Sequence, residues 1–131
     1  MDIGVFIFDT DYSINISELA RELEERGYES LFVPEHTHIP TSRRSPFPGG
    51  GELPKQYSHT LDPFVSLGFA AASTKNLKIG TGICLLPQRD PIVTAKSIAS
   101  LDLMSKGRFV LGLGGGWNVD EMENHGVTYK T

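Results

Sequence analysis

Short apolar runs alternate along the chain with segments in which apolar residues recur at helical spacing. The apolar runs cover residues 3–8, 30–34, 77–86 and 108–113. Runs of this length are typical of strands that are buried on both faces, as in a parallel sheet. Between them, apolar residues recur every three or four positions, which indicates helices with one buried face. The pattern predicts the order β-α-β-loop-α-β-α-β, followed by a short, acidic, helix-like segment.

Capping residues mark the ends of the predicted helices. Asn15 and Asp62 carry side-chain oxygens that can accept the first free backbone N–H groups of a helix. A proline follows Asp62 directly, and Pro91 opens the third predicted helix. Gly27 and Gly107 stand where the first and third helices should end.

Strands that alternate with helices predict parallel pairing and right-handed crossovers. An open doubly wound sheet and a closed barrel both meet this description. A full (β/α)8 barrel takes roughly 250 residues, so four βα units in 131 residues correspond to about half of one. The fold class is α/β, and we expect residues 1–131 to form a single domain. The segment 35–60 is a long loop rich in proline and glycine, and such loops are usually functional.

Composition and charge narrow the class of protein. Hydrophobic residues make up 39% of the chain and charged residues 21%, which is typical of a soluble globular protein. The net charge of −4 disfavours a nucleic-acid partner, because phosphate binding needs clustered lysines and arginines. The basic pair Arg43-Arg44 lies in the long loop and is expected to be solvated. Without signal-peptide features or an apolar run near the ~18 residues of a membrane helix, the sequence predicts a cytoplasmic protein with no membrane partner.

Conspicuous residues stand at the carboxyl ends of three predicted strands, where parallel α/β folds bind their ligands. Glu35 and His36 follow the second strand. The third strand carries Thr81, Gly82 and Ile83 near its end, and glycine inside a strand often marks a bulge. The fourth strand is followed by Gly114, Gly115, Gly116, Trp117 and Asn118. We expect these residues to share one rim.

The glycine cluster does not fit a dinucleotide-binding fingerprint. Gly112 and Gly114 would need a third glycine at position 117, which is Trp117, and the cluster follows the fourth strand. A backbone turn that approaches a flat ring or a phosphate closely is the favoured interpretation. A simple tight turn remains the alternative.

The pair His36 and His38 is weak as a metal site, because ligands must converge from several elements, and we predict no metal. We favour His36 as a proton or hydrogen-bond donor near a substrate, since histidine titrates near neutral pH. Glu35 would orient His36 or contact a cofactor. The alternative is a hydrogen-bonded pair with no role in chemistry.

Three further residues are expected to be structural. Cys84 is the single cysteine, which excludes an internal disulfide bond and a zinc site built on cysteines. A buried apolar role suits it best. His59 and His125 stand in no supporting pattern and are expected to be structural or exposed.

Taken together, these segments resemble the luciferase-like monooxygenase family, the bacterial-luciferase-like oxidoreductases that use a flavin or the deazaflavin F420. The stretch 91–121 carries much of the resemblance through Ser105-x-Gly107-Arg108 and Gly114-x-Gly116-Trp117-Asn118. The strand end 33–36 and the pair Asp62-Pro63 match as well. The resemblance covers nearly the whole chain.

The resemblance implies a (β/α)8 barrel with its cofactor at the carboxyl rim. In such relatives the third strand has a bulge with a non-proline cis peptide behind the cofactor ring, and the matching pair here is Gly82-Ile83. Glu35 and His36 would lie near the reacting edge of the ring, with residues 114–118 beside it. The Gly-Ile pair favours F420 over FMN, and the implied reaction is hydride transfer to or from a small organic substrate.

Relatives continue through four more βα units, which supply phosphate-binding loops. Three functions therefore stay open: an F420-dependent oxidoreductase, an FMN-dependent monooxygenase, or a non-catalytic half-barrel that pairs with itself or a partner. Half a barrel exposes two strand edges, so we expect a homodimer or higher self-association.

Overall fold

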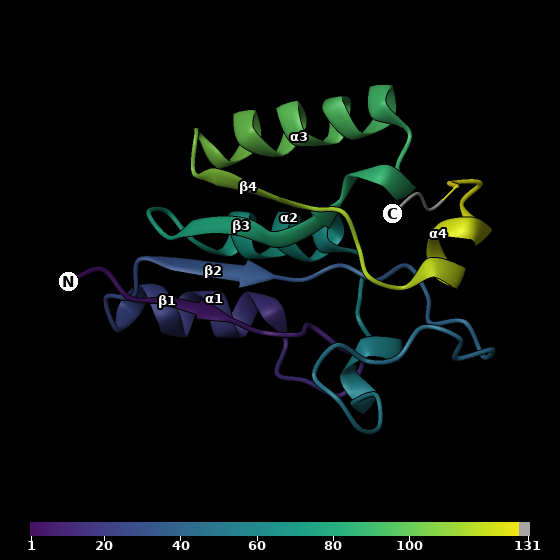
Figure 1. The fold of residues 1–131 in the computed structure, drawn as a ribbon. Coiled ribbons are helices and arrows are strands. Elements are labelled where there is room, and N and C mark those ends of the chain that lie inside the picture. Colours follow the sequence, from purple (N-terminus) through teal and green to yellow (C-terminus); the bar gives the residue numbers. More distant parts are fainter. Residues whose placement is uncertain (129–131) are drawn as a thin grey trace.

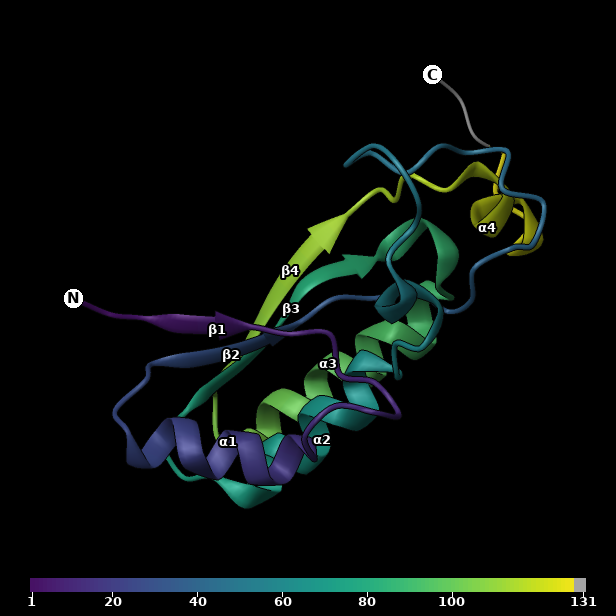
Figure 2. The ribbon, with the colours of Figure 1, turned by 90° about the horizontal axis from the view of Figure 1, so that it is seen from below.

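The strands form one parallel sheet, and α1, α2 and α3 cover a single face of it (Figure 1, Figure 2). The computed structural model describes residues 1–128. In spatial order, the strands are β1 (Gly4–Phe6), β2 (Ser30–Val33), β3 (Lys78–Leu85) and β4 (Phe109–Gly114). The helices are α1 (Ile16–Glu25), α2 (Pro63–Ser73), α3 (Pro91–Ser105) and α4 (Val119–Asn124), with 3₁₀ turns at Lys55–Ser58 and Leu86–Gln88.

The α/β class and the parallel pairing are confirmed. Spatial order follows chain order, as in successive βα units of a barrel. A doubly wound sheet would instead carry helices on both faces.

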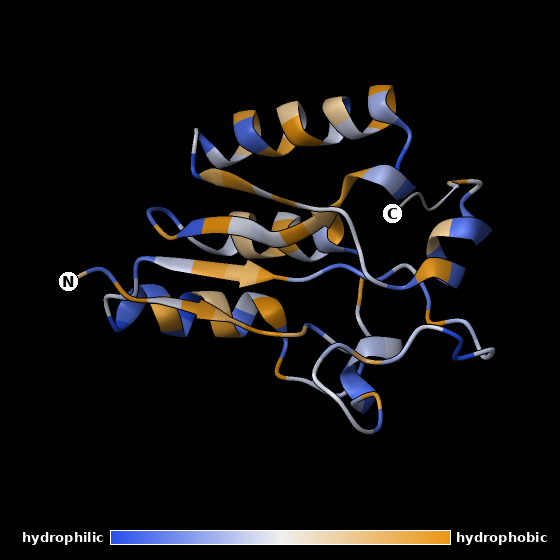
Figure 3. Ribbon diagram, in the orientation of Figure 1, coloured by the Kyte–Doolittle hydropathy of each residue, from blue (hydrophilic) through white to orange (hydrophobic). Residues whose placement is uncertain are grey.

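The hydrophobic core lies between the sheet and its helices. Leu31 and Val33 of β2 and Ile79 of β3 are buried in one cluster with Ala20 of α1 and Leu67 of α2. Hydrophobic residues run along β1 and β2, whereas the long loop is largely hydrophilic (Figure 3). The core therefore fixes the strand positions and leaves the carboxyl ends of the strands free to build a site.

The first strand is not buried on both faces, so that prediction was wrong. β1 is shorter than the run 3–8 and forms one edge of the sheet, where Phe6 is 53% exposed. Leu113 is 58% exposed on β4, at the opposite edge. An apolar run shows that a strand is favoured but does not show whether a second neighbour covers it.

Capping residues begin and end the helices much as predicted. Asn15 and Asp62 accept hydrogen bonds from backbone N–H groups in the first turns of α1 and α2. Asp90, which the sequence analysis did not single out, does the same for α3. Gly27 and Gly107 follow α1 and α3 with a positive φ of 77°. No helix in residues 1–128 has both the length and the apolar character needed to cross a membrane.

Arg108 joins the carboxyl ends of two helices to the sheet. Its guanidinium donates to the carbonyl oxygens of Ala71 at 2.9 Å, Leu77 at 2.7 Å and Ser105 at 2.8 Å, and to the hydroxyl of Thr74 at 2.9 Å. Carbonyl groups at helix ends lack partners within the helix, so one side chain satisfies several of them.

The bulge expected in β3 is present, but the expected cis peptide is not. The register between β3 and β4 shifts between Thr81 and Cys84. None of the peptide bonds in residues 1–128 is cis, so the prediction for Gly82-Ile83 was wrong. The extra residue of a bulge already bends the strand, and a cis bond without proline costs about 3 kcal/mol. The Thr81 hydroxyl accepts from the N–H of Gly112 and donates to its carbonyl oxygen.

We expect Gly112→Ala to destabilise the protein by roughly 1–3 kcal/mol through overpacking. A Cβ at Gly112 would lie 2.2 Å from the carbonyl oxygen of Thr81, and backbone held in a sheet cannot move aside easily. Gly68→Ala in α2 is the matched control, because a Cβ there meets nothing within 4 Å. It should stabilise the helix by about 0.5–1 kcal/mol. Urea denaturation measures both, and a Gly112→Ala variant as stable as the wild type would contradict the packing described.

Candidate functional site

A cavity of about 640 Å³ opens where β2, β3 and β4 end. Aromatic side chains form much of its wall: Phe6, Phe8, Phe47, Tyr57 and Trp117. The structure brings most of the predicted rim residues together here, namely Glu35, His36, Ile83, Gly114, Gly115, Gly116 and Trp117. The three rim segments expected from the sequence therefore share one cavity.

Three predicted residues do not line this cavity. Thr81 is fully buried in the ladder between β3 and β4. A side chain at Gly82 would meet the ring of Phe6 at 2.1 Å, so Phe6 covers this glycine. Asn118 is buried and caps α4 by accepting from the backbone N–H of Glu121 at 3.2 Å. These three residues lie behind the cavity wall and support the segments that form it.

The His36 side chain forms part of the cavity wall, and the buried carboxylate of Glu121 contacts its imidazole ring. Its Nδ1 lies 2.8 Å from Oε2 of Glu121. The rings of Tyr57 and Trp117 lie 5.3 Å and 5.7 Å from the imidazole, measured between centroids. The hydrogen bond and the two rings together fix the plane of the imidazole.

Glu121 is a site residue that the sequence did not reveal, as are the aromatic residues of the cavity wall other than Trp117. Its side chain is completely buried, and its Oε1 also accepts from the backbone N–H of Thr37 at 3.0 Å. Burial raises the pKa of Glu121, but the hydrogen bond and charge of His36 and the N–H of Thr37 outweigh it, so the pKa is lowered. The acidic run in the last predicted helix was the available signal, but that run does not show which acid faces inward.

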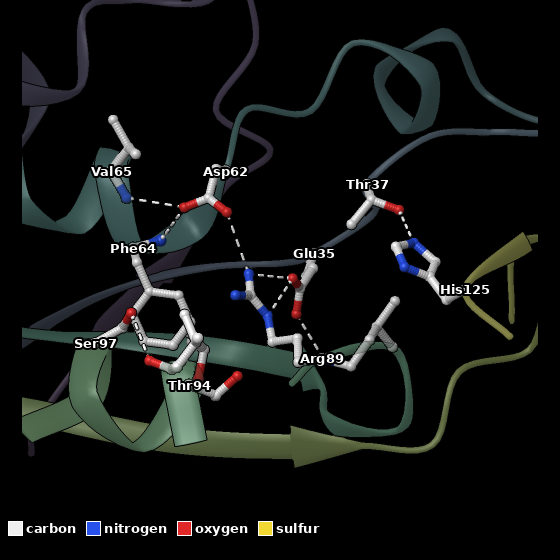
Figure 4. Close-up of polar contacts among 12 residues, drawn as sticks. Glu35, Thr37, Asp62, Phe64, Val65, Arg89, Thr94, Ser97 and His125 are labelled. Carbon is white, nitrogen blue, oxygen red and sulfur yellow. Dashed lines mark hydrogen bonds and ion pairs between the residues drawn. The ribbon is translucent and has the colours of Figure 1, made fainter. Parts of the chain in front are cut away.

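Glu35 does not orient His36, so this part of the prediction was wrong. Its Oε2 accepts from the backbone N–H of Leu85 at 2.6 Å, and its Oε1 accepts from Nε of Arg89 at 2.7 Å. Arg89 also donates to Asp62, the cap of α2, at 3.2 Å (Figure 4). A buried carboxylate needs such partners. Glu35 therefore fixes the end of β3 beside the cavity and is neutralised by Arg89.

The long loop is attached to α4 by ion pairs. Arg44 contacts Asp120 and lies 2.6 Å from Glu123. The Arg44 side chain is 63% exposed, as expected for a residue of a solvated loop, and it forms these ion pairs at the surface. These contacts connect the long loop, which contributes Phe47 and Tyr57 to the cavity, to α4.

The remaining histidines and the cysteine take structural positions. Thr37 Oγ1 lies 2.7 Å from Nε2 of His125 (Figure 4) and 3.0 Å from Nδ1 of His38. Nδ1 of His59 lies 2.8 Å from Oδ1 of Asp11. Cys84 is buried as predicted, and burial, followed by the nearby charge of Glu35, raises the pKa of its thiol to about 11. Within residues 1–128, no three or more His, Cys, Asp or Glu side chains gather as metal ligands.

Each of the three glycines at the end of β4, Gly114, Gly115 and Gly116, is required or tolerated for a different structural reason. A side chain at Gly114 would collide with Ile83 across the sheet, at 2.4 Å. Gly116 has a φ of +83°, a conformation that favours glycine. A Cβ at Gly115 meets nothing within 4 Å, so the backbone there is open beside the cavity. This open backbone is what the close approach of a flat ligand requires.

The sequence of the chain matches the model of a known family. A family model described as luciferase-like monooxygenase matches residues 1–131. The chain belongs to the luciferase-like monooxygenase family. The proteins similar to this chain include an F420-dependent reductase and a monooxygenase component solved with FMN.

Three relatives illustrate the range. An uncharacterised protein of Mycobacterium tuberculosis is 45% identical over 130 residues, which cover 97% of this chain and 46% of the relative. The solved coenzyme F420 dependent tetrahydromethanopterin reductase of Methanopyrus kandleri is 26% identical, with a TM-score of 0.67 over 93% of this chain and 30% of that one. The oxygenating constituent of 3,6-diketocamphane monooxygenase from Pseudomonas putida, solved with FMN, is 22% identical. Its TM-score is 0.74 over 98% of this chain and 33% of that one, a likeness of fold alone.

The chain therefore spans about half the length of the mycobacterial relative and about a third of each solved chain. The expected α/β architecture of consecutive barrel units agrees with these neighbours.

We expect Glu121→Gln to lower the free energy of unfolding by about 1–3 kcal/mol at pH ~7, since hydrogen bonds to a charged group are replaced by weaker bonds to a neutral one. Because the pKa of Glu121 is lowered in the folded protein, its contribution is present above the ordinary value of 4.5 and is lost as the pH falls through the lowered pKa. The difference between variant and wild type in urea denaturation should therefore shrink below pH 4.5. The exposed neighbour substitution Glu123→Gln is the control, and a difference for Glu121→Gln that does not depend on pH would contradict the account.

Proposed function

We propose that the cavity binds the ring of a deazaflavin of the F420 type, and that the protein is an oxidoreductase that transfers hydride between this cofactor and a small organic molecule. One observation carries the proposal. In a member of the luciferase-like family, the apolar cavity is bordered by His36, Ile83 and the open backbone of Gly115.

The residues present fit such a ring. A volume of about 640 Å³ lies within the range of small-molecule sites, which are mostly apolar with a few placed polar groups. Tyr57 and Trp117 offer flat apolar walls, and Gly115 lets a ring approach the backbone closely. Glu35 contributes no free charge to this wall because it is paired with Arg89.

A bound deazaflavin supplies a carbon centre that gives or accepts hydride and reacts poorly with oxygen. The chain's own residues position the reactants. His36 would hydrogen-bond the substrate at the cavity wall, Tyr57 and Trp117 would exclude water, and Glu35 would keep the end of β3 in place. Binding and orientation of this kind are the protein's share of such chemistry.

F420 is preferred over FMN on two grounds. The F420-dependent relative is 26% identical to this chain, whereas the FMN-bound relative at 22% supports the fold alone. The Gly82-Ile83 pair at the bulge also resembles the F420-using branch. An FMN-dependent monooxygenase is the second candidate, and the family's own description favours it.

A third candidate is a half-barrel without catalysis that pairs with itself. Exposed apolar residues at the two sheet edges, Phe6 and Leu113, favour self-association, which we propose as a homodimer or higher oligomer. The mass in solution reports on this state independently of cofactor binding.

We expect F420 to quench the tryptophan fluorescence on binding, because Trp117 is the single tryptophan and lines the cavity. Gly115→Val should weaken F420 binding at least about tenfold, which corresponds to about 1.4 kcal/mol, since the added side chain enters open space beside the cavity. Gly68→Val is the control, because it places the same side chain on α2, where the added Cβ meets nothing within 4 Å.

Each outcome of this titration decides between the candidates. Tighter binding of FMN than of F420 overturns the choice of cofactor in favour of the second candidate. Failure of both to bind, together with a defined oligomer, overturns the enzymatic proposal in favour of the half-barrel.

A further inference from the structure

The Glu121 carboxylate contacts two residues at once. Its Oε1 accepts from the backbone N–H of Thr37 at 3.0 Å and from the Thr37 hydroxyl at 3.4 Å, and its Oε2 lies 2.8 Å from Nδ1 of His36. Because the pKa of Glu121 is lowered, the group is ionised at neutral pH and can only accept hydrogen bonds. The nitrogen facing Oε2 must therefore carry a hydrogen.

The neutral imidazole ring has one N–H and one unprotonated nitrogen. If Nδ1 of His36 carries the hydrogen, Nε2 is left as the acceptor. Nε2 has no hydrogen-bond partner among residues 1–128, and His36 lines the cavity. The nitrogen that remains available to a ligand is thus the unprotonated one.

Glu121 has little freedom to adopt another arrangement. Its side chain is fully buried, so a different rotamer would leave a charged group without partners. Its own backbone N–H is held by the side chain of Asn118, the cap of α4. Packing of Tyr57 and Trp117 against the imidazole opposes rotation of the ring.

We propose that Glu121 is a positioning residue that fixes His36 in the Nδ1–H tautomer and so presents an unprotonated Nε2 to the cavity. The proposal deepens the proposed function, because it rests on His36 meeting a ligand there. It assigns neutral His36 the role of hydrogen-bond acceptor toward a ligand that carries an O–H or N–H group. With the hydrogen held on Nδ1, the ring donates from Nε2 only when it is protonated.

The substitution Glu121→Gln should invert the tautomer. A carboxamide has one accepting oxygen and one donating NH₂ group. The backbone N–H of Thr37 can only donate, so the oxygen must face Thr37 and the NH₂ must face Nδ1 of His36. Nδ1 must then be unprotonated, and the hydrogen moves to Nε2. A merely structural role for Glu121 does not predict this change.

The experiment is nitrogen-15 NMR of the ring nitrogens in histidine-labelled protein without cofactor, at pH ~8, where an ordinary imidazole is neutral. We expect the Nδ1–H form of His36 to predominate at least about tenfold in the wild type, and the Nε2–H form to predominate in Glu121→Gln. Glu123→Gln, an exposed acid on the same helix, should retain the wild-type spectrum.

The wild type alone can overturn the proposal. A predominant Nε2–H form in the wild type, or an unchanged tautomer in a folded Glu121→Gln variant, would refute it. If the variant does not fold, the wild-type spectrum still decides. Since no cofactor is used, a failure of F420 binding and a failure of the tautomer assignment are distinguishable.

Discussion

A buried carboxylate held between Thr37 and His36 is the constraint on which the rim depends. Glu121 meets His36, which lies 85 positions earlier in the chain, and it is fully removed from water. A charge in such a place is tolerated only when it is paired and hydrogen-bonded. The pairing therefore draws α4 against the segment that follows β2, and the cavity forms beside their junction.

A second buried acid holds the neighbouring wall. Glu35 binds Arg89 and the backbone of Leu85, and so fixes the end of β3 relative to β2. The two adjacent residues Glu35 and His36 thus have different roles. One secures a strand end, and the other presents a ring to the cavity with Glu121 behind it. Because each acid is turned toward its own hydrogen-bond partners, the cavity wall remains largely apolar.

The sequence predicted the elements because their signals are local. Periodicity, the caps Asn15 and Asp62, and glycine inside β3 each report on a few neighbouring residues. The sequence also predicted which rim segments meet at the cavity, because parallel strands place their carboxyl ends at one edge of the sheet. The Glu121–His36 contact could not be predicted, since nothing local shows which acid of a short helix faces inward. The exposure of β1 depends likewise on neighbours that a strand pattern does not reveal.

A double-mutant cycle on His36 and Glu121 tests the central claim most directly. The unfolding free energies of wild type, His36→Ala, Glu121→Ala and the double variant give the energy of coupling between the two side chains. The account predicts a coupling of about 0.5–3 kcal/mol, as for residues in one buried hydrogen-bond network. Effects that add within about 0.3–0.5 kcal/mol would show that the two residues act independently and would contradict it.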